Sequence, residues 1–249
     1  MPISSSSVFH FTNDINALKG ILSEGLQVSY CKEDINGIFD ETGVSIAVPM
    51  VSFCDLPLSE IKNHIDSYGK YAVGFSKTWA QINRLNPVFY LDTNSTLAAS
   101  LSDLLLHFLE GKESIQNIDH LGHQAVNILR YTKNYEADLK RKGITTKNYR
   151  FSDEREWRYI PELDDSHEPF IAMDQYKTEA DRKKANETLK NLKLEFGAND
   201  IKYLIIKEEE EISELIDFLR KENGKKYTYQ DTERLMTRIL TSDQILADF

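Results

Sequence analysis

The sequence has little of what disulfide-rich, zinc-binding and membrane-spanning proteins need. Its 249 residues include two cysteines, Cys31 and Cys54, which provide neither a disulfide framework nor a zinc quartet. No apolar run approaches the roughly 20 residues of a membrane helix. The first residues, MPISSSSVF, lack the basic and long apolar segments of a signal peptide. We therefore expect a soluble, cytoplasmic protein with no membrane segment.

Repeats, low-complexity segments and glycine-rich phosphate loops are also missing. The 11 glycines form neither a Rossmann fingerprint nor a P-loop, which argues against those two nucleotide sites. The formal net charge is -10. Such an acidic surface repels phosphate backbones in general, so broad nucleic-acid affinity is not expected, although a local basic groove stays open.

What the sequence does have is a strand and helix signal close to its start. Residues 8–12 are strand-like, and Asn13 or Asp14 can cap the helix that follows. That helix is expected to end at Gly25. Further strands are expected at 48–56, 71–76, 87–91, 149–161 and 201–207.

The middle of the chain changes character. Residues 95–148 have a helical pattern, whereas residues 27–47 are mixed and indicate a loop or a lid. Several strands follow one another too closely for a doubly wound sheet. We predict a single α+β domain, residues 1–249, with a helical insertion at 95–148.

Charged side chains dominate one expected strand. Along 149–161, Glu154, Glu156 and Arg158 would share a face because strand side chains alternate. Two carboxylates so close repel each other unless a positive group lies between them, and such a pair can hold one carboxylate for a specific task. The alternative is a surface ladder of Glu and Arg on an edge strand.

His10 places an ionisable ring between Phe9 and Phe11. One interpretation is a packed core histidine with a satisfied hydrogen bond. The other is a ligand contact, because Thr12 shares its face and the two side chains together could bind sugar hydroxyls and an amide.

The strand at 48–56 offers a second polar strip. Ser52 and Cys54 share one face, while Phe53 lies on the other and could stack on a flat ring or simply fill the core. Cys54 has no neighbouring signature of an activated thiolate. His120 and His123 have a spacing that can hold a metal, but no acidic pair accompanies them, which leaves surface or packed histidines as the alternative.

Taken in order, the H-x-T strand, LxxILxxGL, VPMVSFCDLP and the Glu-Arg-Glu triplet resemble the ADP-ribosyltransferase fold. The resemblance implies a split mixed β-sheet and NAD as the cofactor. It also implies a catalytic carboxylate, which would stabilise the positive charge that builds on the ribose carbon, an effect of about 3–4 kcal/mol for one well-placed group. The resemblance implies that His10 and Thr12 contact the two riboses and that Ser52 and Phe53 (or Tyr68 or Tyr71) contact the nicotinamide. Glu156 would be the catalytic residue, and Glu154 or the helical insertion would orient the acceptor.

More narrowly, several segments resemble the AbiGi family of abortive phage infection proteins. They are HFTN with LKGILSEGL, PMVSFCDLPLSEIKNHIDSYGKYAVGFSKTWA, NPVFY and DEREWRYIP, and they cover most of residues 8–161. The resemblance implies a role in anti-phage defence. Because that family is described as an antitoxin, it also implies a partner toxin or antitoxin protein.

Three hypotheses follow. The first is an NAD-dependent ADP-ribosyltransferase with a protein or nucleic-acid acceptor. The second is a non-catalytic antitoxin that binds and restrains a partner. The third is a metal-dependent nuclease using Asp153, Glu154 and Glu156, which is disfavoured because no lysine-containing nuclease constellation is visible beside those acids.

Overall fold

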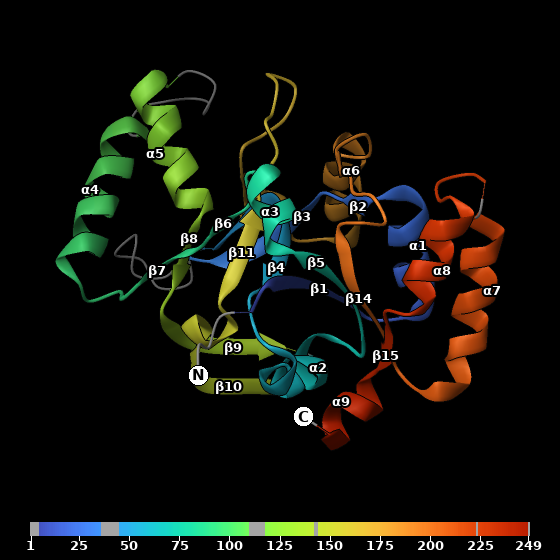
Figure 1. Cartoon of the computed structure of the whole chain (residues 1–249). Helices are drawn as coiled ribbons and strands as arrows, with labels where there is room; N and C mark the ends of the chain where they lie inside the picture. Colours follow the sequence, from blue (N-terminus) through green and yellow to red (C-terminus); the bar gives the residue numbers. More distant parts are fainter. Residues whose placement is uncertain (1–4, 36–44, 110–117, 142–143, 223, 249) are drawn as a thin grey trace. The chain divides into compact units, whose positions relative to one another are not determined.

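The computed structural model describes residues 5–35, 45–109, 118–141, 144–222 and 224–248 (Figure 1). The chain divides into two compact units. Unit 1 comprises Met1–Gln27, Ser52–Asn86 and Lys193–Phe249, and unit 2 comprises Val28–Val51 and Pro87–Leu192. Each unit has a hydrophobic cluster of its own.

Unit 1 is built on a mixed sheet with the strand order β15-β14-β5-β1. β14 pairs in parallel with β15 and antiparallel with β5, which in turn pairs antiparallel with β1. The strands are β1 (Ser7–Thr12), β2 (Leu26–Gln27), β5 (Tyr71–Ser76), β13 (Lys193–Leu194), β14 (Ile201–Ile206), β15 (Ile239–Thr241) and the end of β4 (Ser45–Cys54). The helices are α1 (Ile15–Glu24), η1 (Leu58–Glu60), α2 (Lys62–Tyr68), α3 (Lys77–Ile82), η5 (Glu209–Glu211), α7 (Ile212–Glu222), α8 (Tyr229–Met236) and α9 (Ser242–Asp248).

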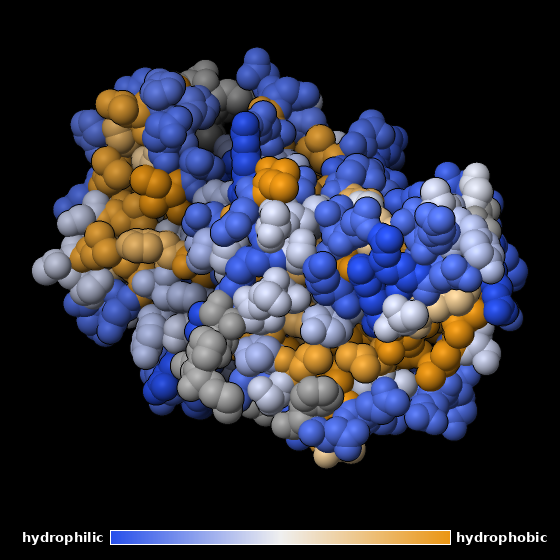
Figure 2. All heavy atoms as spheres, in the orientation of Figure 1, coloured by the Kyte–Doolittle hydropathy of each residue, from blue (hydrophilic) through white to orange (hydrophobic). Residues whose placement is uncertain are grey.

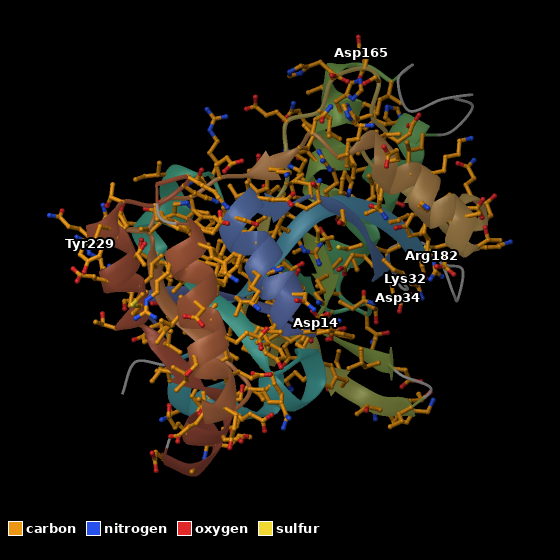
Figure 3. The ribbon with its side chains drawn as sticks, turned by 90° about the vertical axis from the view of Figure 1, so that its right-hand side faces the viewer. Asp14, Lys32, Asp34, Asp165, Arg182 and Tyr229 are labelled. Carbon is orange, nitrogen blue, oxygen red and sulfur yellow. The ribbon has the colours of Figure 1, made fainter. Side chains whose placement is uncertain are left out.

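The first helix of unit 1 begins and ends as its sequence predicts. The Asp14 side chain, labelled in Figure 3, accepts the backbone N–H groups of Asn16 and Ala17 and so satisfies two donors at the start of α1. Leu18 and Leu22, four residues apart on one face, are buried. The helix stops at Gly25, whose φ of 93° is one that residues with a Cβ rarely adopt.

Unit 2 combines short strands with a helix pair. Its strands are β3 (Ser29–Asp34), the first part of β4, β7 (Phe89–Leu91), β8 (Thr132–Asn134), β9 (Glu136–Arg141), β10 (Ile144–Arg150), β11 (Glu156–Tyr159) and β12 (Ile171–Ala172), while β6 (Asn86–Pro87) lies at the unit boundary. Its helices are α4 (Thr96–Leu109), α5 (His120–Arg130), η3 (Phe151–Glu154), η4 (Met173–Gln175) and α6 (Glu179–Thr188). β3 and β12 both pair antiparallel with β4, and β7 pairs in parallel with β8.

The core of unit 2 lies between β4 and the two helices α4 and α5, which are drawn in green in Figure 1. Val48 and Met50 of β4 belong to the same buried cluster as Leu105 of α4 and Leu129 of α5. Leu101 and Leu105, four residues apart on α4, are both buried, so one face of this helix packs against the core.

The α+β class with a mixed sheet is confirmed. The helical pattern expected over 95–148 holds for α4 and α5 but is wrong for β8, β9 and β10. Threonines in β8 and β10 favour strands, and β9 is held as a strand by its pairing with β10, which overrides the weak helical pattern. None of the described helices is long and apolar enough to cross a membrane.

Candidate functional site

The two charged residues of β11 form a tight ion pair inside unit 2. Glu156 and Arg158 lie two residues apart on the strand, so their side chains share a face as expected. The Arg158 Nε donates to Glu156 Oε1 at 2.7 Å, and Nη2 donates to Oε2 at 3.4 Å. Arg158 is fully buried and Glu156 is 5% exposed. A surface ladder on an edge strand is therefore excluded.

Lys133 of β8 supplies a second positive charge. Its Nζ donates to Glu154 Oε2 at 2.9 Å and to Glu156 Oε2 at 2.6 Å. This is the positive group that two neighbouring carboxylates require. The ammonium also lies 5.0 Å from the centre of the Phe151 ring, within cation–π range.

Glu33 of β3 completes what we term the ion-pair network, composed of Glu33, Lys133, Glu154, Glu156 and Arg158. Arg158 Nη2 lies 2.9 Å from Glu33 Oε1. The neighbours of Glu33 on β3, Lys32 and Asp34, form a separate ion pair at 2.9 Å (labelled in Figure 3). Because side chains alternate along a strand, Glu33 lies on one face of β3 and joins the network, whereas Lys32 and Asp34 lie on the other face.

Backbone geometry brings Glu154 to Lys133 although Glu154 is not on the strand. Residues 151–154 form the 3₁₀ turn η3, and Arg155 then has a φ of 47° in the left-handed region. The strand expected over 149–161 is therefore interrupted: residues 149–150 end β10, and β11 begins only at Glu156. The Glu156 N–H donates to the Tyr90 hydroxyl at 2.8 Å, which fixes the start of β11.

The network divides its carboxylates into two kinds. Burial opposes ionisation of Glu156, but the charges of Arg158 and Lys133 outweigh it and lower its pKa to about 2. For Glu33, burial prevails over the attraction of Arg158 and Lys133, and its pKa is raised. Burial also opposes the charge of Lys133, yet Glu156, Glu33 and Glu154 raise the pKa of its ammonium well above the usual value.

These charges determine what the network can do chemically. Glu156 is ionised at neutral pH and both of its oxygens accept hydrogen bonds, so it is a poor proton acceptor. Glu33 is the member able to hold a proton, because its pKa is raised and, among the described residues, it shares Arg158 with Glu156. Among the described residues no three His, Cys, Asp or Glu side chains are grouped so as to hold a metal ion.

The expectation that no lysine accompanies these acids is wrong. Lys133 contacts both glutamates, but it lies more than 20 residues before them, on a short strand inside the segment whose pattern is helical. No local signal in the sequence marks it. The contact depends on the pairing of β8 with β7, which is a long-range feature.

The residues expected to bind a cofactor lie in unit 1. His10 Nδ1 is 2.8 Å from the Ser52 carbonyl oxygen, so Nδ1 carries the proton and donates it to that oxygen. Burial lowers the pKa of His10, and the bond to Ser52 opposes this shift only in part. The neutral ring has the satisfied hydrogen bond that the core interpretation requires.

Phe53 is a core side chain. It is 2% exposed, and its ring meets Phe75 and Trp79 edge-on, with centroid distances of 6.0 and 5.8 Å. His10 lies 5.6 Å away from the same ring. Stacking on nicotinamide would require Phe53 to leave this cluster.

Thr12 and Tyr71 face each other in the β1–β5 pair. The Tyr71 hydroxyl donates to Glu211 Oε1 at 2.6 Å, and burial together with this bond raises its pKa. The tyrosine side chain is 8% exposed. Tyr71 thus has an internal partner at its polar end, whereas Tyr68, the other candidate, stacks on His64 at 4.9 Å.

The surroundings of the remaining candidates, two histidines and two cysteines, do not indicate a metal site or an activated thiolate. His120 and His123 are both exposed on α5, which agrees with the surface alternative. Cys31 and Cys54 are not joined by a disulfide. Burial and the nearby Glu33 carboxylate raise the pKa of Cys31 to about 12, so it is not an activated thiolate.

Comparison with known proteins identifies the family. A family model described as "Putative abortive phage resistance protein AbiGi, antitoxin" matches residues 24–207, well over half of the chain. The chain belongs to the AbiGi family. The resemblance to this family is thereby confirmed.

A relative from Lactococcus lactis subsp. cremoris, named "Abortive phage resistance protein AbiGi", is 29% identical over 222 residues. The match covers 81% of this chain and 89% of that relative. No solved structure matches this AbiGi-family chain, so the ADP-ribosyltransferase-like arrangement stays a prediction. The AbiGi-family match includes every residue of the ion-pair network.

Proposed function

We propose that this chain acts in abortive phage resistance as the antitoxin of a toxin–antitoxin pair, by binding a partner protein without catalysis. The AbiGi family description and the name of the Lactococcus relative support this role. The structural observation that carries the proposal is the engagement of Glu156, the residue expected to catalyse ADP-ribosyl transfer.

The energies favour a structural role for Glu156. Glu156 is 5% exposed and is held by Arg158 and Lys133, so a ribose hydroxyl would reach it only if one of these two cations moved away. Breaking a buried ion pair costs about 3–5 kcal/mol. A well-placed catalytic group supplies about 3–4 kcal/mol. The gain does not exceed the cost, so Glu156 stabilises the fold of unit 2 better than it serves a reaction.

A surface suited to a partner protein lies on α4 and α5. Figure 2 shows apolar side chains gathered over these two helices. Leu97 and Leu104 lie seven residues apart on α4, and Leu121 and Ile128 lie seven apart on α5, so each pair shares one helical face. Their exposed fractions are 50%, 39%, 63% and 48%. We propose that the partner toxin covers this surface, which we term the α4–α5 face.

Co-expression with the protein encoded by the neighbouring gene tests the proposal. The wild-type chain is expected to co-purify with that protein and to protect cells from it. Leu121→Asp with Ile128→Asp should abolish both effects while leaving the melting temperature nearly unchanged, because these side chains are exposed. The matched control is Ile144→Asp on β10, which is 70% exposed in the same unit and away from both helices.

Two outcomes would contradict this function. One is a wild-type chain that neither co-purifies with that protein nor protects cells from it, whereas retention of both effects in the α4–α5 variants would contradict only the assignment of the α4–α5 face. The other is protection that requires Glu156 in a variant shown to be folded, since that result would point to catalysis.

The second candidate is an NAD-dependent ADP-ribosyltransferase that modifies a protein or nucleic-acid acceptor. The observation that favours it is the neutral His10 ring, whose Nδ1 donates to Ser52 and so leaves Nε2 as an acceptor for a ribose hydroxyl. Calorimetric titration with NAD on the wild type and on His10→Ala tests the binding. Saturable binding that His10→Ala abolishes would favour the enzyme, and no binding at millimolar NAD would eliminate it.

A further inference from the structure

Two arginines are buried in unit 2, and they differ in their hydrogen-bond partners. Arg158 is fully buried, and Nε and Nη2, the two donors on one edge of its guanidinium, both meet Glu156. Arg130, the last residue of α5, is 8% exposed. Its Nε and Nη2 are buried with no hydrogen-bond partner in the part of the chain that the structure describes. The Nε–Nη2 edge therefore donates hydrogen bonds in Arg158 but has no acceptor among the described residues in Arg130.

Among the described residues, no carboxylate compensates for the charge of Arg130. Burial lowers the pKa of its guanidinium to about 10, and the groups that act against burial are the phenols of Tyr131 and Tyr30, not carboxylates. The Tyr30 hydroxyl already donates its proton to the Glu168 carbonyl at 2.8 Å. Within the described ranges Arg130 forms no ion pair, in contrast to Arg158 with its two glutamates.

The position of Arg130 at the end of α5 compensates for only part of its positive charge. A cation in the last turn of a helix interacts favourably with the carbonyl end of the helix dipole. However, the Arg130 carbonyl oxygen itself accepts a bond from Arg158 Nη1 at 2.8 Å. A buried guanidinium with two free donors on one edge is thus short of two acceptor oxygens and one negative charge.

We propose that Arg130 anchors an oxyanion, a carboxylate or phosphate group carried by a ligand, on its Nε–Nη2 edge. This edge presents two parallel N–H groups whose spacing fits two oxygens bound to the same carbon or phosphorus. The residue keeps 8% of its surface exposed, so it lies just below the surface, and binding an anion there would require a side-chain rotation that uncovers this edge. The test below uses the isolated chain, so its outcome does not depend on the partner protein proposed above.

Thermal unfolding in the presence of small anions tests the site. Sodium chloride is replaced stepwise by sodium phosphate, or by sodium acetate, at constant ionic strength. The wild type is expected to show a saturable rise in melting temperature that Arg130→Met abolishes. The matched control is Arg150→Met, which removes an exposed arginine of the same unit and should keep the response. A response to phosphate alone identifies a phosphorylated ligand, and a response to acetate alone identifies a carboxylate.

A second readout separates a binding residue from a structural one. In chloride, Arg130→Met should raise the melting temperature by about 2–4 °C, the shift that a modest gain in stability produces in a chain of this length. Arg130→Lys keeps the charge but loses the two-donor edge, so the anion concentration at half-response should rise about tenfold. The proposal is overturned if the wild type gives no saturable response, or if Arg150→Met loses the response to the same extent as Arg130→Met.

Discussion

Replacing Glu156 by glutamine tests the ion-pair network most directly. Glutamine preserves the shape of the side chain but removes its charge. Arg158 would then keep Glu33 as its carboxylate partner, and Lys133 would keep Glu154. Both cations stay buried, with less negative charge beside them than in the wild type.

The expected loss follows from the pKa of Glu156. The network lowers that pKa from 4.5 to about 2. At about 1.4 kcal/mol for each tenfold change, this difference corresponds to about 3 kcal/mol of unfolding free energy. The value agrees with the about 3–5 kcal/mol that breaking a buried ion pair costs in other proteins.

The sign of the pH dependence is also fixed. Because the pKa is lower in the folded state, the contribution of Glu156 is complete above the unfolded value of 4.5 and is lost as the pH falls from there through about 2. The difference between wild type and Glu156→Gln should therefore be about 3 kcal/mol at pH 7 and should shrink as the pH approaches 3.

Urea unfolding followed by circular dichroism measures this difference. Glu154→Gln is the matched control, because it removes a bond to Lys133 that Glu156 still supplies, and it should cost less than Glu156→Gln. A loss below about 1 kcal/mol at pH 7, the size typical of a surface ion pair, would refute the reasoning. So would a loss that does not change between pH 7 and pH 3.

Three further predictions concern unit 1. Gly69→Ala should cost at least about 1–3 kcal/mol in urea unfolding, because φ is +129° and a Cβ would lie 2.2 Å from the Thr12 carbonyl oxygen; Gly20→Ala, which meets nothing within 4 Å, should be neutral or stabilising. Asp14→Ala should cost about 0.5–2 kcal/mol in the same assay through loss of the α1 cap. The folded pKa of His10 lies below 6.5, so wild-type stability should fall as the pH drops below 6.5, and the melting temperature of His10→Gln should lack this component.

Local signals predicted the start of the chain well. An alternating strand, an aspartate cap, leucines four residues apart and a glycine stop specify β1 and α1 within a single stretch, and the structure has each of them where expected. The same holds for the buried strand β14, which lies within the expected strand at 201–207. In all of these elements the residues that decide the structure are neighbours in the sequence.

The candidate site was less predictable because its contacts join distant strands. The pairing of Glu154 with Glu156 was visible in the sequence, but the left-handed Arg155 between them was not. Lys133 and Glu33 come from strands in segments expected to be helical or irregular. Only the fold brings their charges together, and only the fold leaves Arg130 without a carboxylate while Arg158 has two.

The position of β14 in the sheet has a consequence for the newly made chain. β14 pairs with both β5 and β15, yet it belongs to the last of the three segments that form unit 1. During synthesis all of unit 2 leaves the ribosome before β14 does, so unit 2 can fold first although the middle of the chain encodes it. Until then β5 has an unpaired strand edge, which is a template for aggregation. Premature termination before residue 201 should therefore yield insoluble fragments.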